Sequence, residues 1–334
     1  MKRNTSSQSE GLRITDNSSQ RKSAGWLPSA VLAAGAVLAL CPVNGAAAPG
    51  RTDACQRTAD AVERSCQAGA QSDYQLALAK CENIVNQAKR KVCQEQAAAD
   101  LNEALQTCSD QHAARVAACS RLGPAPYDPV IKRSDFVATI DNPYFPLRPG
   151  TTFIYEGQTA AGLEHSEFAV THNTRVILGV TCIEVRDTVF TDGVLTEDTL
   201  DWFAQDKDGN VWYFGENTHE LEDGLISTID GTFMAGVNGD KAGIIMKAHP
   251  AIGDFYRQEF SLGNAEDFAE TLSLTESVTV PAGAFRNCLK SQETTPLETD
   301  LLEHKFYAPG VGNVLTVDAT TGSRVELIQI RTGK

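Results

Sequence analysis

Basic residues are scarce in this chain. Its 334 residues include 29 Lys and Arg against 43 Asp and Glu, which gives a formal net charge of −14. The imbalance falls on residues 123–334, which hold 15 basic and 32 acidic side chains. Because such a surface repels phosphate backbones, we expect no nucleic-acid partner. Solubility alone can explain the charge, although it also attracts cations and basic partners.

Apolar runs of membrane-spanning length are missing after residue 41. Before that point a polar, basic stretch (1–23) precedes an apolar stretch (24–41), and the small residues GAAAP follow. This order is typical of a signal peptide, so we expect residues 1–48 to be removed. An uncleaved anchor and a lipid on Cys41 are the alternatives, although Leu40 is larger than a lipoprotein signal prefers at that position. The expected location is secreted or periplasmic, in the cell envelope, without a membrane span after cleavage.

Closely spaced cysteine pairs are also missing. No CxxC occurs, which argues against structural zinc, and eight cysteines remain after Cys41. An even number of thiols in an exported chain favours disulfides. We expect disulfide bonds to involve all eight: Cys55, Cys66, Cys81, Cys93, Cys108, Cys119, Cys182 and Cys288.

Residues 51–122 are predicted to form a cysteine-rich helical region. Good helix formers dominate there, and neither Gly nor Pro occurs from Gln71 to Leu122. Gly69 and the residues just after it are expected to form a turn. The six cysteines are separated by 11, 15, 12, 15 and 11 residues, and spacings of 11 or 15 keep the thiols close to one helix face. The segment therefore predicts an α-helical hairpin or bundle stapled by disulfides.

The pairing of these six cysteines stays open at this stage, since fifteen connectivities are possible. Two antiparallel units would join Cys55 to Cys93 and Cys66 to Cys81, and the mirror choice would join Cys81 to Cys119 and Cys93 to Cys108. Thiols left over could link two chains, so a disulfide-linked oligomer is an alternative.

Residues 123–131 (GPAPYDPVI) are expected to be a linker, and residues 132–331 a β-rich domain. Short β-branched and aromatic runs are separated there by Gly, Asn and Asp, as in antiparallel sheets. A short helix is expected from Asn264 to Phe268. Strands are expected near 151–157, 165–172, 174–178, 181–191, 195–204, 210–215, 225–230, 242–248, 254–261, 270–281, 285–294, 301–308, 312–318 and 324–331.

The β-rich domain contains an internal echo. Cys182 is followed by the aromatic run DWFA and then by Gly209-Asn210, and Cys288 is followed by KFYA and then by Gly312-Asn313. Two related units therefore predict a mainly β fold, an antiparallel curved sheet or partly open barrel. The echo places Cys182 and Cys288 at equivalent positions, where they form either the remaining disulfide or two buried thiols.

Two segments, VPAGAFRNC and FYAPGVGNV, resemble bacterial envelope proteins of the TapB-like kind. The run EDTLDWFAQDKDGNVWYFGE is similar to a group of secreted bacterial proteins to which no chemistry is assigned. The resemblance covers roughly residues 140–331. It implies a curved antiparallel sheet and an extracytoplasmic location, and it carries over no catalytic residue.

Asp206, Asp208 and Asn210 suggest a calcium loop, because oxygen ligands at alternate positions suit that ion. Gly and Glu are displaced from their EF-hand positions, however. Asp-Gly between two strands is also a strong hairpin signal, so a turn is the favoured interpretation.

Glu197, Asp198 and Glu216 are the candidate catalytic residues, since paired carboxylates beside aromatic residues are what a glycosidase uses. The alternative interpretation is that these three carboxylates are solvent-exposed charges on the faces of strands. No HExxH or GxSxG motif is present, and no cofactor is expected.

Three functional hypotheses follow. The first is a non-enzymatic exported protein that binds an apolar small ligand or a protein partner on its curved sheet. The second is a carboxylate-dependent, glycosidase-like hydrolase. The third is a structural cell-surface protein crosslinked by its cysteine helices.

Overall fold

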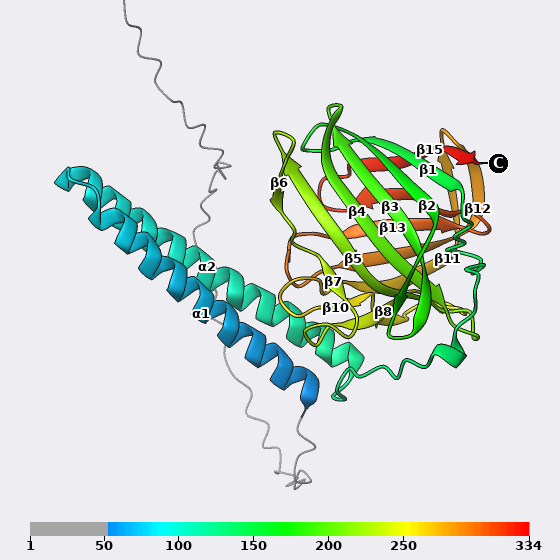
Figure 1. The fold of residues 1–334 in the computed structure, drawn as a ribbon, viewed down its shortest axis with the longest axis horizontal. Coiled ribbons are helices and arrows are strands. Elements are labelled where there is room, and N and C mark those ends of the chain that lie inside the picture. Colours follow the sequence, from blue (N-terminus) through cyan, green and yellow to red (C-terminus); the bar gives the residue numbers. More distant parts are fainter. Residues whose placement is uncertain (1–52, 334) are drawn as a thin grey trace, which may run out of the picture. The chain divides into compact units, whose positions relative to one another are not determined.

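The computed structural model describes residues 53–333, which form a helical hairpin and a curved β-sheet (Figure 1). The expected signal segment, residues 1–48, lies outside these residues. None of the helices within 53–333 combines the length and apolar character that crossing a membrane requires.

The hairpin consists of α1 (Ala54–Glu82) and α2 (Gln87–Leu122). Asp53 and Asn86 cap the two helices by accepting hydrogen bonds from the backbone N–H groups of Gln56 and Lys89, at 2.9 and 3.0 Å. The expected turn at Gly69 is wrong, because α1 continues through it and the turn lies at residues 83–86. A single helical glycine costs only about 1 kcal/mol, which three crosslinks easily outweigh.

Three nested disulfides join the two helices. Cys55 bonds to Cys119, Cys66 to Cys108 and Cys81 to Cys93, with Cα–Cα distances of 5.6, 5.7 and 5.6 Å. The helical hairpin is therefore confirmed, and the connectivity left open by the sequence is neither of the two pairings considered above. The spacings 11, 15, 12, 15 and 11 read the same in both directions, and one antiparallel hairpin with its turn near their midpoint satisfies every bond. All six thiols pair within the chain, so an interchain link through them requires one of these bonds to open.

A buried ion pair links α2 to the β-rich region. The guanidinium of Arg115 donates to both carboxylate oxygens of Glu266 at 2.7–3.2 Å, and the two residues are 4% and 1% exposed. A buried arginine needs such a partner, because an unpaired charge would be costly there.

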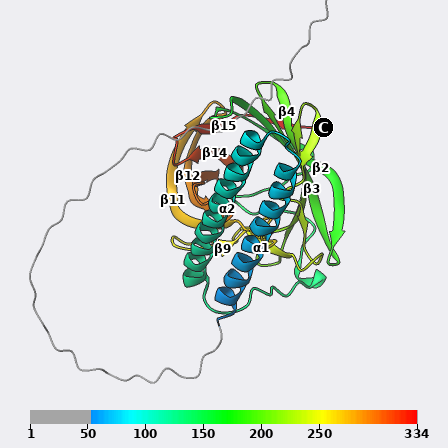
Figure 2. The ribbon, with the colours of Figure 1, turned by 90° about the vertical axis from the view of Figure 1, so that its left-hand side faces the viewer.

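The β-rich region is a nearly closed antiparallel barrel of thirteen strands, in the order β10-β8-β5-β4-β3-β2-β1-β15-β14-β13-β12-β11-β9. Its curvature is visible in Figures 1 and 2, where β2 and β3 face β11 and β12 across the interior. Two short strands, β6 (Leu225–Thr228) and β7 (Phe233–Met234), pair with β5 beside this path. The strands on the path are β1 (Thr151–Gln158), β2 (Leu163–Ile177), β3 (Val180–Thr191), β4 (Val194–Gln205), β5 (Val211–Glu222), β8 (Lys241–Met246), β9 (Phe255–Arg257), β10 (Glu259–Phe260), β11 (Phe268–Val280), β12 (Gly283–Thr294), β13 (Glu303–Ala308), β14 (Gly312–Asp318) and β15 (Arg324–Thr332).

One short segment closes the ring. β9 pairs with β11 and β10 pairs with β8, and only Gln258 separates β9 from β10 in the chain. Gly243 on β8 permits the close approach, since a Cβ at that position would lie 2.2 Å from the Gln258 carbonyl oxygen. A larger residue at 243 would push the closing segment outward, so this glycine fixes where Gln258 lies.

The two related units are confirmed as two three-stranded meanders, β3-β4-β5 and β12-β13-β14. Val185 pairs with Asp201 and Asp187 with Thr199 in the first unit. Ser291 pairs with Lys305 and Glu293 with Glu303 in the second. Ser291 and Glu293 follow Cys288 by three and five residues, as Val185 and Asp187 follow Cys182. The next ladder of each unit also has a register shift at the same place, between Trp202 and Phe203 and between Phe306 and Tyr307. Pairing register thus supports the sequence echo residue by residue.

Cys182 and Cys288 are both unbonded and buried, so the alternative of two buried thiols is confirmed and the disulfide between them is wrong. They lie in two separate hydrophobic clusters. Cys182 packs in the cluster of Trp202 and Phe214, and Cys288 in the larger cluster with Leu289 and Val314. Equivalent residues of two repeats can form a disulfide only if the repeats are in contact at those residues. Cys182 and Cys288 do not meet this condition, because they lie in different clusters.

Most expected strands are present, with four differences, one of which is the additional short strand β7 (Phe233–Met234). The strands expected at 165–172 and 174–178 form one continuous strand, β2, and the strand expected at 254–261 is divided into β9 and β10. The expected helix from Asn264 to Phe268 is wrong. A bridge between Ser261 and Ala265 makes a tight turn there, and Phe268 already begins β11.

Candidate functional site

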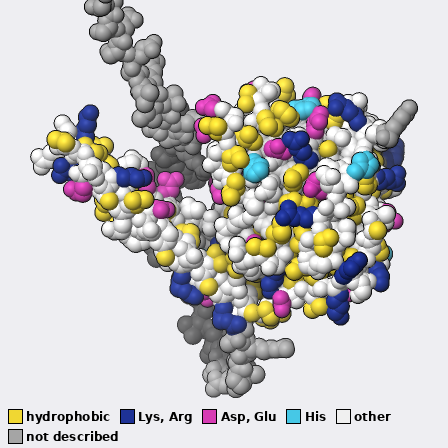
Figure 3. All heavy atoms as spheres, in the orientation of Figure 1, with side chains coloured by type: hydrophobic (Ala, Val, Ile, Leu, Met, Phe, Trp, Pro, Cys, Tyr) yellow, Lys and Arg dark blue, Asp and Glu magenta, His cyan; other side chains and the backbone are white. Residues whose placement is uncertain are grey.

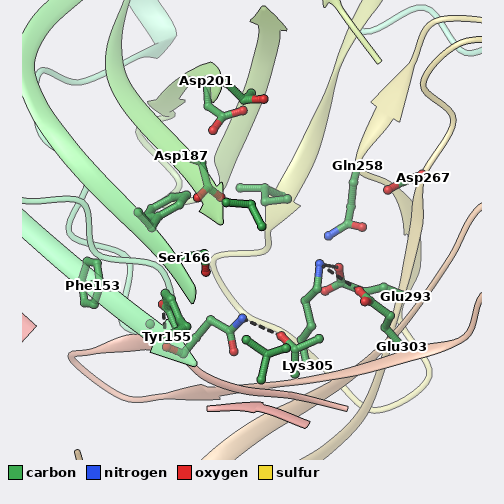
Figure 4. A pocket seen from close by; sticks show the side chains of 18 of the residues that line it. Phe153, Tyr155, Ser166, Asp187, Asp201, Gln258, Asp267, Glu293, Glu303 and Lys305 are labelled. Carbon is green, nitrogen blue, oxygen red and sulfur yellow. Dashed lines mark hydrogen bonds and ion pairs between the residues drawn. The ribbon is translucent and has the colours of Figure 1, made fainter. Parts of the chain in front are cut away.

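The barrel contains a cavity of about 960 Å³ that is partly open to solvent (Figure 4). Residues of β1 to β5 line one side, and residues of β12 to β15 line the other. A cavity of this size accommodates a small organic molecule.

Aromatic side chains form part of the cavity wall. Phe203 and Tyr213 stack with ring centroids 4.6 Å apart, and Phe145 contacts Phe203 edge to face at 5.4 Å. Phe153 and Phe168 extend this wall, with centroids 6.3 Å apart. Aromatic rings in such arrangements offer apolar area at low entropic cost.

The polar part of the cavity has almost one sign of charge. Lys305 is the only basic residue among those that line it. On the molecular face in Figure 3, by contrast, basic and acidic side chains are interspersed. The acidic lining residues are Glu164, Asp187, Glu197, Asp201, Glu216, Glu259, Asp267, Glu293, Glu298, Glu303 and Asp318.

The carboxylate of Glu293 in the second unit is fully partnered. Lys305 Nζ lies 2.8 Å from one of its oxygens, and the hydroxyls of Ser291 and Tyr307 each donate to the other at 2.9 Å. Burial alone would raise the pKa of Glu293, but the Lys305 charge and these hydrogen bonds hold it below its ordinary value. Lys305 also lies 3.4 Å from Glu303, and the two carboxylates raise the pKa of Lys305 well above its ordinary value against the effect of burial.

In the first unit, one hydroxyl serves two carboxyl groups. Tyr213 Oη bonds to Asp201 and lies 2.9 Å from Glu216. A phenol carries a single proton, so one of the two carboxyls must itself be protonated for both bonds to form. Burial raises the pKa of Glu216 to about 7 and that of Asp201 well above its ordinary value, which supplies this proton at neutral pH.

Asp187 and Gln258 each bring an unpartnered polar atom to the cavity. Oδ1 of Asp187 is inaccessible to solvent and has no hydrogen-bond partner within residues 53–333. Burial, with the nearby charges of Asp201, Glu197 and Glu164, raises the pKa of Asp187 well above its ordinary value. Gln258 is 2% exposed, and its side-chain amide nitrogen likewise has no partner among these residues. Buried polar groups are normally hydrogen-bonded, so both side chains retain unmet hydrogen-bonding capacity beside the cavity.

Two of the three candidate catalytic residues meet in this cavity. Glu197 on β4 and Glu216 on β5 both line it, whereas Asp198 does not. Successive side chains of a strand point to opposite faces, and Asp198 makes a bidentate ion pair with Arg186, at 2.7 and 2.8 Å, on the other face. That ion pair lowers the pKa of Asp198.

The residues considered for calcium form the turn between β4 and β5. The Asp206 carboxylate accepts hydrogen bonds from the backbone and side chain of Asn210 and from the indole of Trp212, at 2.8–2.9 Å. Asp208 lies exposed at the tip of the turn. Across the described part of the chain, no group of three or more His, Cys, Asp or Glu side chains is arranged to hold a metal ion.

Sequence reasoning missed the roles of Asp187, Gln258, Glu293 and Lys305. A signal for three of them lay in the echo, since Asp187 and Glu293 each follow their cysteine by five residues, and Lys305 takes the place that Asp201 has in DWFA. Nothing in the sequence around Gln258 marks it, because its position depends on ring closure.

These features define a class: an antiparallel barrel with an acidic, partly aromatic cavity, preceded by a disulfide-linked helical hairpin. Three disulfides are typical of proteins that fold outside the reducing cytosol. No family model and no curated protein matches the chain. Among solved structures, it is similar to a Parabacteroides distasonis protein provisionally described as a lipoprotein, with 17% identity and a TM-score of 0.29 over 57% of this chain and 99% of that one.

Proposed function

We propose that this protein is an exported, non-enzymatic binding protein of the cell envelope or extracellular space, and that it holds a small organic ligand with an apolar part inside the barrel. The observation that carries the proposal is the cavity of about 960 Å³, which combines stacked aromatic rings with the unpartnered polar atoms of Asp187 and Gln258. The three disulfides support the location.

If the interior of the barrel had no ligand to bind, we would expect the side chains of the strands to fill it. Small barrels are usually filled by their side chains, and larger ones enclose ligand cavities. Burying carboxyl groups without partners is costly, and proteins retain such costs mainly at functional sites. A ligand that contacts Asp187 and Gln258 would recover part of this cost on binding.

The test is binding of the neutral, environment-sensitive dye prodan, followed by its fluorescence. Val189 lines the cavity and Thr188, its neighbour on β3, does not. Val189→Trp should fill the cavity and weaken dye binding by about tenfold or more, and Thr188→Trp should leave it unchanged. The proposal fails if the wild-type protein binds no dye, or if both variants bind it as well as the wild type does.

Hydrolysis by carboxylates is the second candidate function. The observation that favours it is the pairing of Glu216, whose pKa burial raises to about 7, with Asp201 through the shared Tyr213 hydroxyl. Such a group can act as a general acid at neutral pH. The measurement is turnover of a panel of nitrophenyl glycosides by wild type and Glu216→Gln. Activity that survives this substitution, or no turnover of any substrate, would overturn the candidate.

A further inference from the structure

We propose that the cavity binds a small organic ammonium ion, whose charged group lies against Asp187 and Asp201 in the place that the Lys305 ammonium occupies in the second unit of the barrel. This inference rests on the binding function proposed above and narrows the chemical class of the ligand.

The first step is the equivalence of the two units. Asp187 and Glu293 are equivalent residues of β3 and β12, each facing the matching position of the next strand, Thr199 or Glu303. The same register places Asp201 of β4 where β13 has Lys305. A carboxyl group therefore stands in the first unit at the position that an ammonium group fills in the second.

The second step is the charge balance of each unit. In the second unit Lys305 Nζ lies 2.8 Å from the Glu293 carboxylate, which also accepts from two hydroxyls. In the first unit the corresponding positions on β3 and β4 both carry carboxyl groups, Asp187 and Asp201, and Oδ1 of Asp187 is buried without a partner among the described residues. Figure 4 shows Asp187 and Asp201 on neighbouring strands, apart from the Lys305 pair. A cation that donates hydrogen bonds is therefore the group that the first unit lacks.

The third step separates an organic cation from a metal ion. Within residues 53–333, no group of three or more His, Cys, Asp or Glu side chains is arranged so that it could hold a metal ion. An ammonium ion has three N–H donors and needs no fixed coordination geometry. The stacked rings of Phe203 and Tyr213 line the same cavity, and Tyr213 bonds directly to Asp201. This arrangement suits an amine with an apolar body, since the rings contact the body while the carboxyls contact the charge.

The experiment compares three six-carbon probes by calorimetry at neutral pH: hexylamine, which is then a cation, neutral 1-hexanol and anionic hexanoate. We expect hexylamine to bind about tenfold or more tightly than hexanol, and hexanoate to bind more weakly still. Hexylamine should also displace prodan from the wild-type protein.

Three variants locate the ammonium group. Asp187→Asn should weaken hexylamine binding by about tenfold or more. Asp201→Lys copies the second unit and should abolish hexylamine binding, because the new lysine would supply the ammonium itself. Asp198→Asn is the matched control, because Asp198 lies on the same strand, β4, but points to the outer face. This variant should bind hexylamine as the wild type does. Thermal unfolding shows whether each variant is folded.

The outcomes separate this inference from the binding function on which it rests. If prodan binds but hexylamine binds no better than hexanol, the ammonium inference is wrong and the binding function stands. Unchanged hexylamine binding by Asp187→Asn also overturns the inference, and this variant decides the matter if Asp201→Lys does not fold. If neither prodan nor any of the three probes binds, both proposals fail.

Discussion

Replacing Lys305 by Met tests whether the single cation of the cavity holds the second unit together. Methionine keeps most of the length of the side chain and removes its charge. Lys305 Nζ lies 2.8 Å from Glu293 and 3.4 Å from Glu303, with the Lys305 side chain 29% exposed and that of Glu293 9% exposed. Removing one partner of a buried pair costs about 3–5 kcal/mol, and the partial exposure of Lys305 lowers our expectation to about 2–3 kcal/mol.

The assay is urea unfolding of wild type, Lys305→Met and the double variant Lys305→Met/Glu293→Gln. The double variant should recover part of the loss, since no unpaired carboxylate then remains at position 293. Lys290→Met is the control: Lys290 precedes Ser291 on β12 and is not among the residues that line the cavity, and its loss should cost about 0.5 kcal/mol or less.

The pH dependence of this deficit has a definite sign. In the wild type the Lys305 charge contributes to a lowered pKa for Glu293. The pair therefore stabilises the fold at pH values above the ordinary pKa of a glutamate, and this stabilisation is lost as the pH falls further. The deficit of Lys305→Met should therefore shrink toward about pH 4, where Glu293 is protonated when Lys305 is absent. A variant as stable as the wild type at neutral pH, or a deficit that grows on acidification, would refute this reasoning.

Three further predictions follow from the structure. First, burial raises the pKa of Glu216 from 4.5 to about 7 in the folded protein, so the free energy of unfolding should fall by up to about 3 kcal/mol as the pH rises between these values. Glu216→Gln should flatten this part of the profile of thermal midpoint against pH, and an unchanged slope would contradict the assignment. Second, Gly243→Ala places a Cβ 2.2 Å from the Gln258 carbonyl oxygen and should cost about 2 kcal/mol or more in urea unfolding, together with weaker prodan binding; unchanged stability would show that the ring is not closed there. Third, replacing Cys66 and Cys108 by Ser opens a loop of 42 residues and should destabilise the hairpin by about 2–4 kcal/mol, measured as a lower thermal midpoint by far-UV circular dichroism; no shift would mean that this bond adds nothing to its two neighbours.

Local sequence patterns predicted most elements of the fold. The absence of Gly and Pro after Gln71 indicated α2, and short β-branched runs indicated nearly every strand. Gly69 was the exception, because a turn there is a local preference that the crosslinks on either side of it, Cys66–Cys108 and Cys81–Cys93, override. The spacing of the six helical cysteines was sufficient to predict the disulfide pairing. The prediction requires that all six belong to one antiparallel hairpin, in which the first cysteine pairs with the last, the second with the fifth and the third with the fourth.

The candidate site was predicted only in part. Glu197 and Glu216 were recognised from a local cluster of acids, but the same cluster included Asp198, which strand alternation places on the other face. Asp187 and Gln258 could not be recognised in this way, since what distinguishes them is burial without a partner. Burial of this kind arises only when distant strands close around a shared interior.

The six residues from Phe255 to Phe260 complete the ring of strands. Because they are continuous in the chain, the register of β9 on β11 and the register of β10 on β8 depend on each other. The segment pairs with β11 on one side and with β8 on the other, and a single residue separates the two ladders. A slip of one residue at either seam would have to be matched by a slip at the other, and it would also turn Gln258 away from the interior. The barrel therefore has few alternative alignments to explore during folding, and the geometry of its cavity is set in the same step that completes the ring.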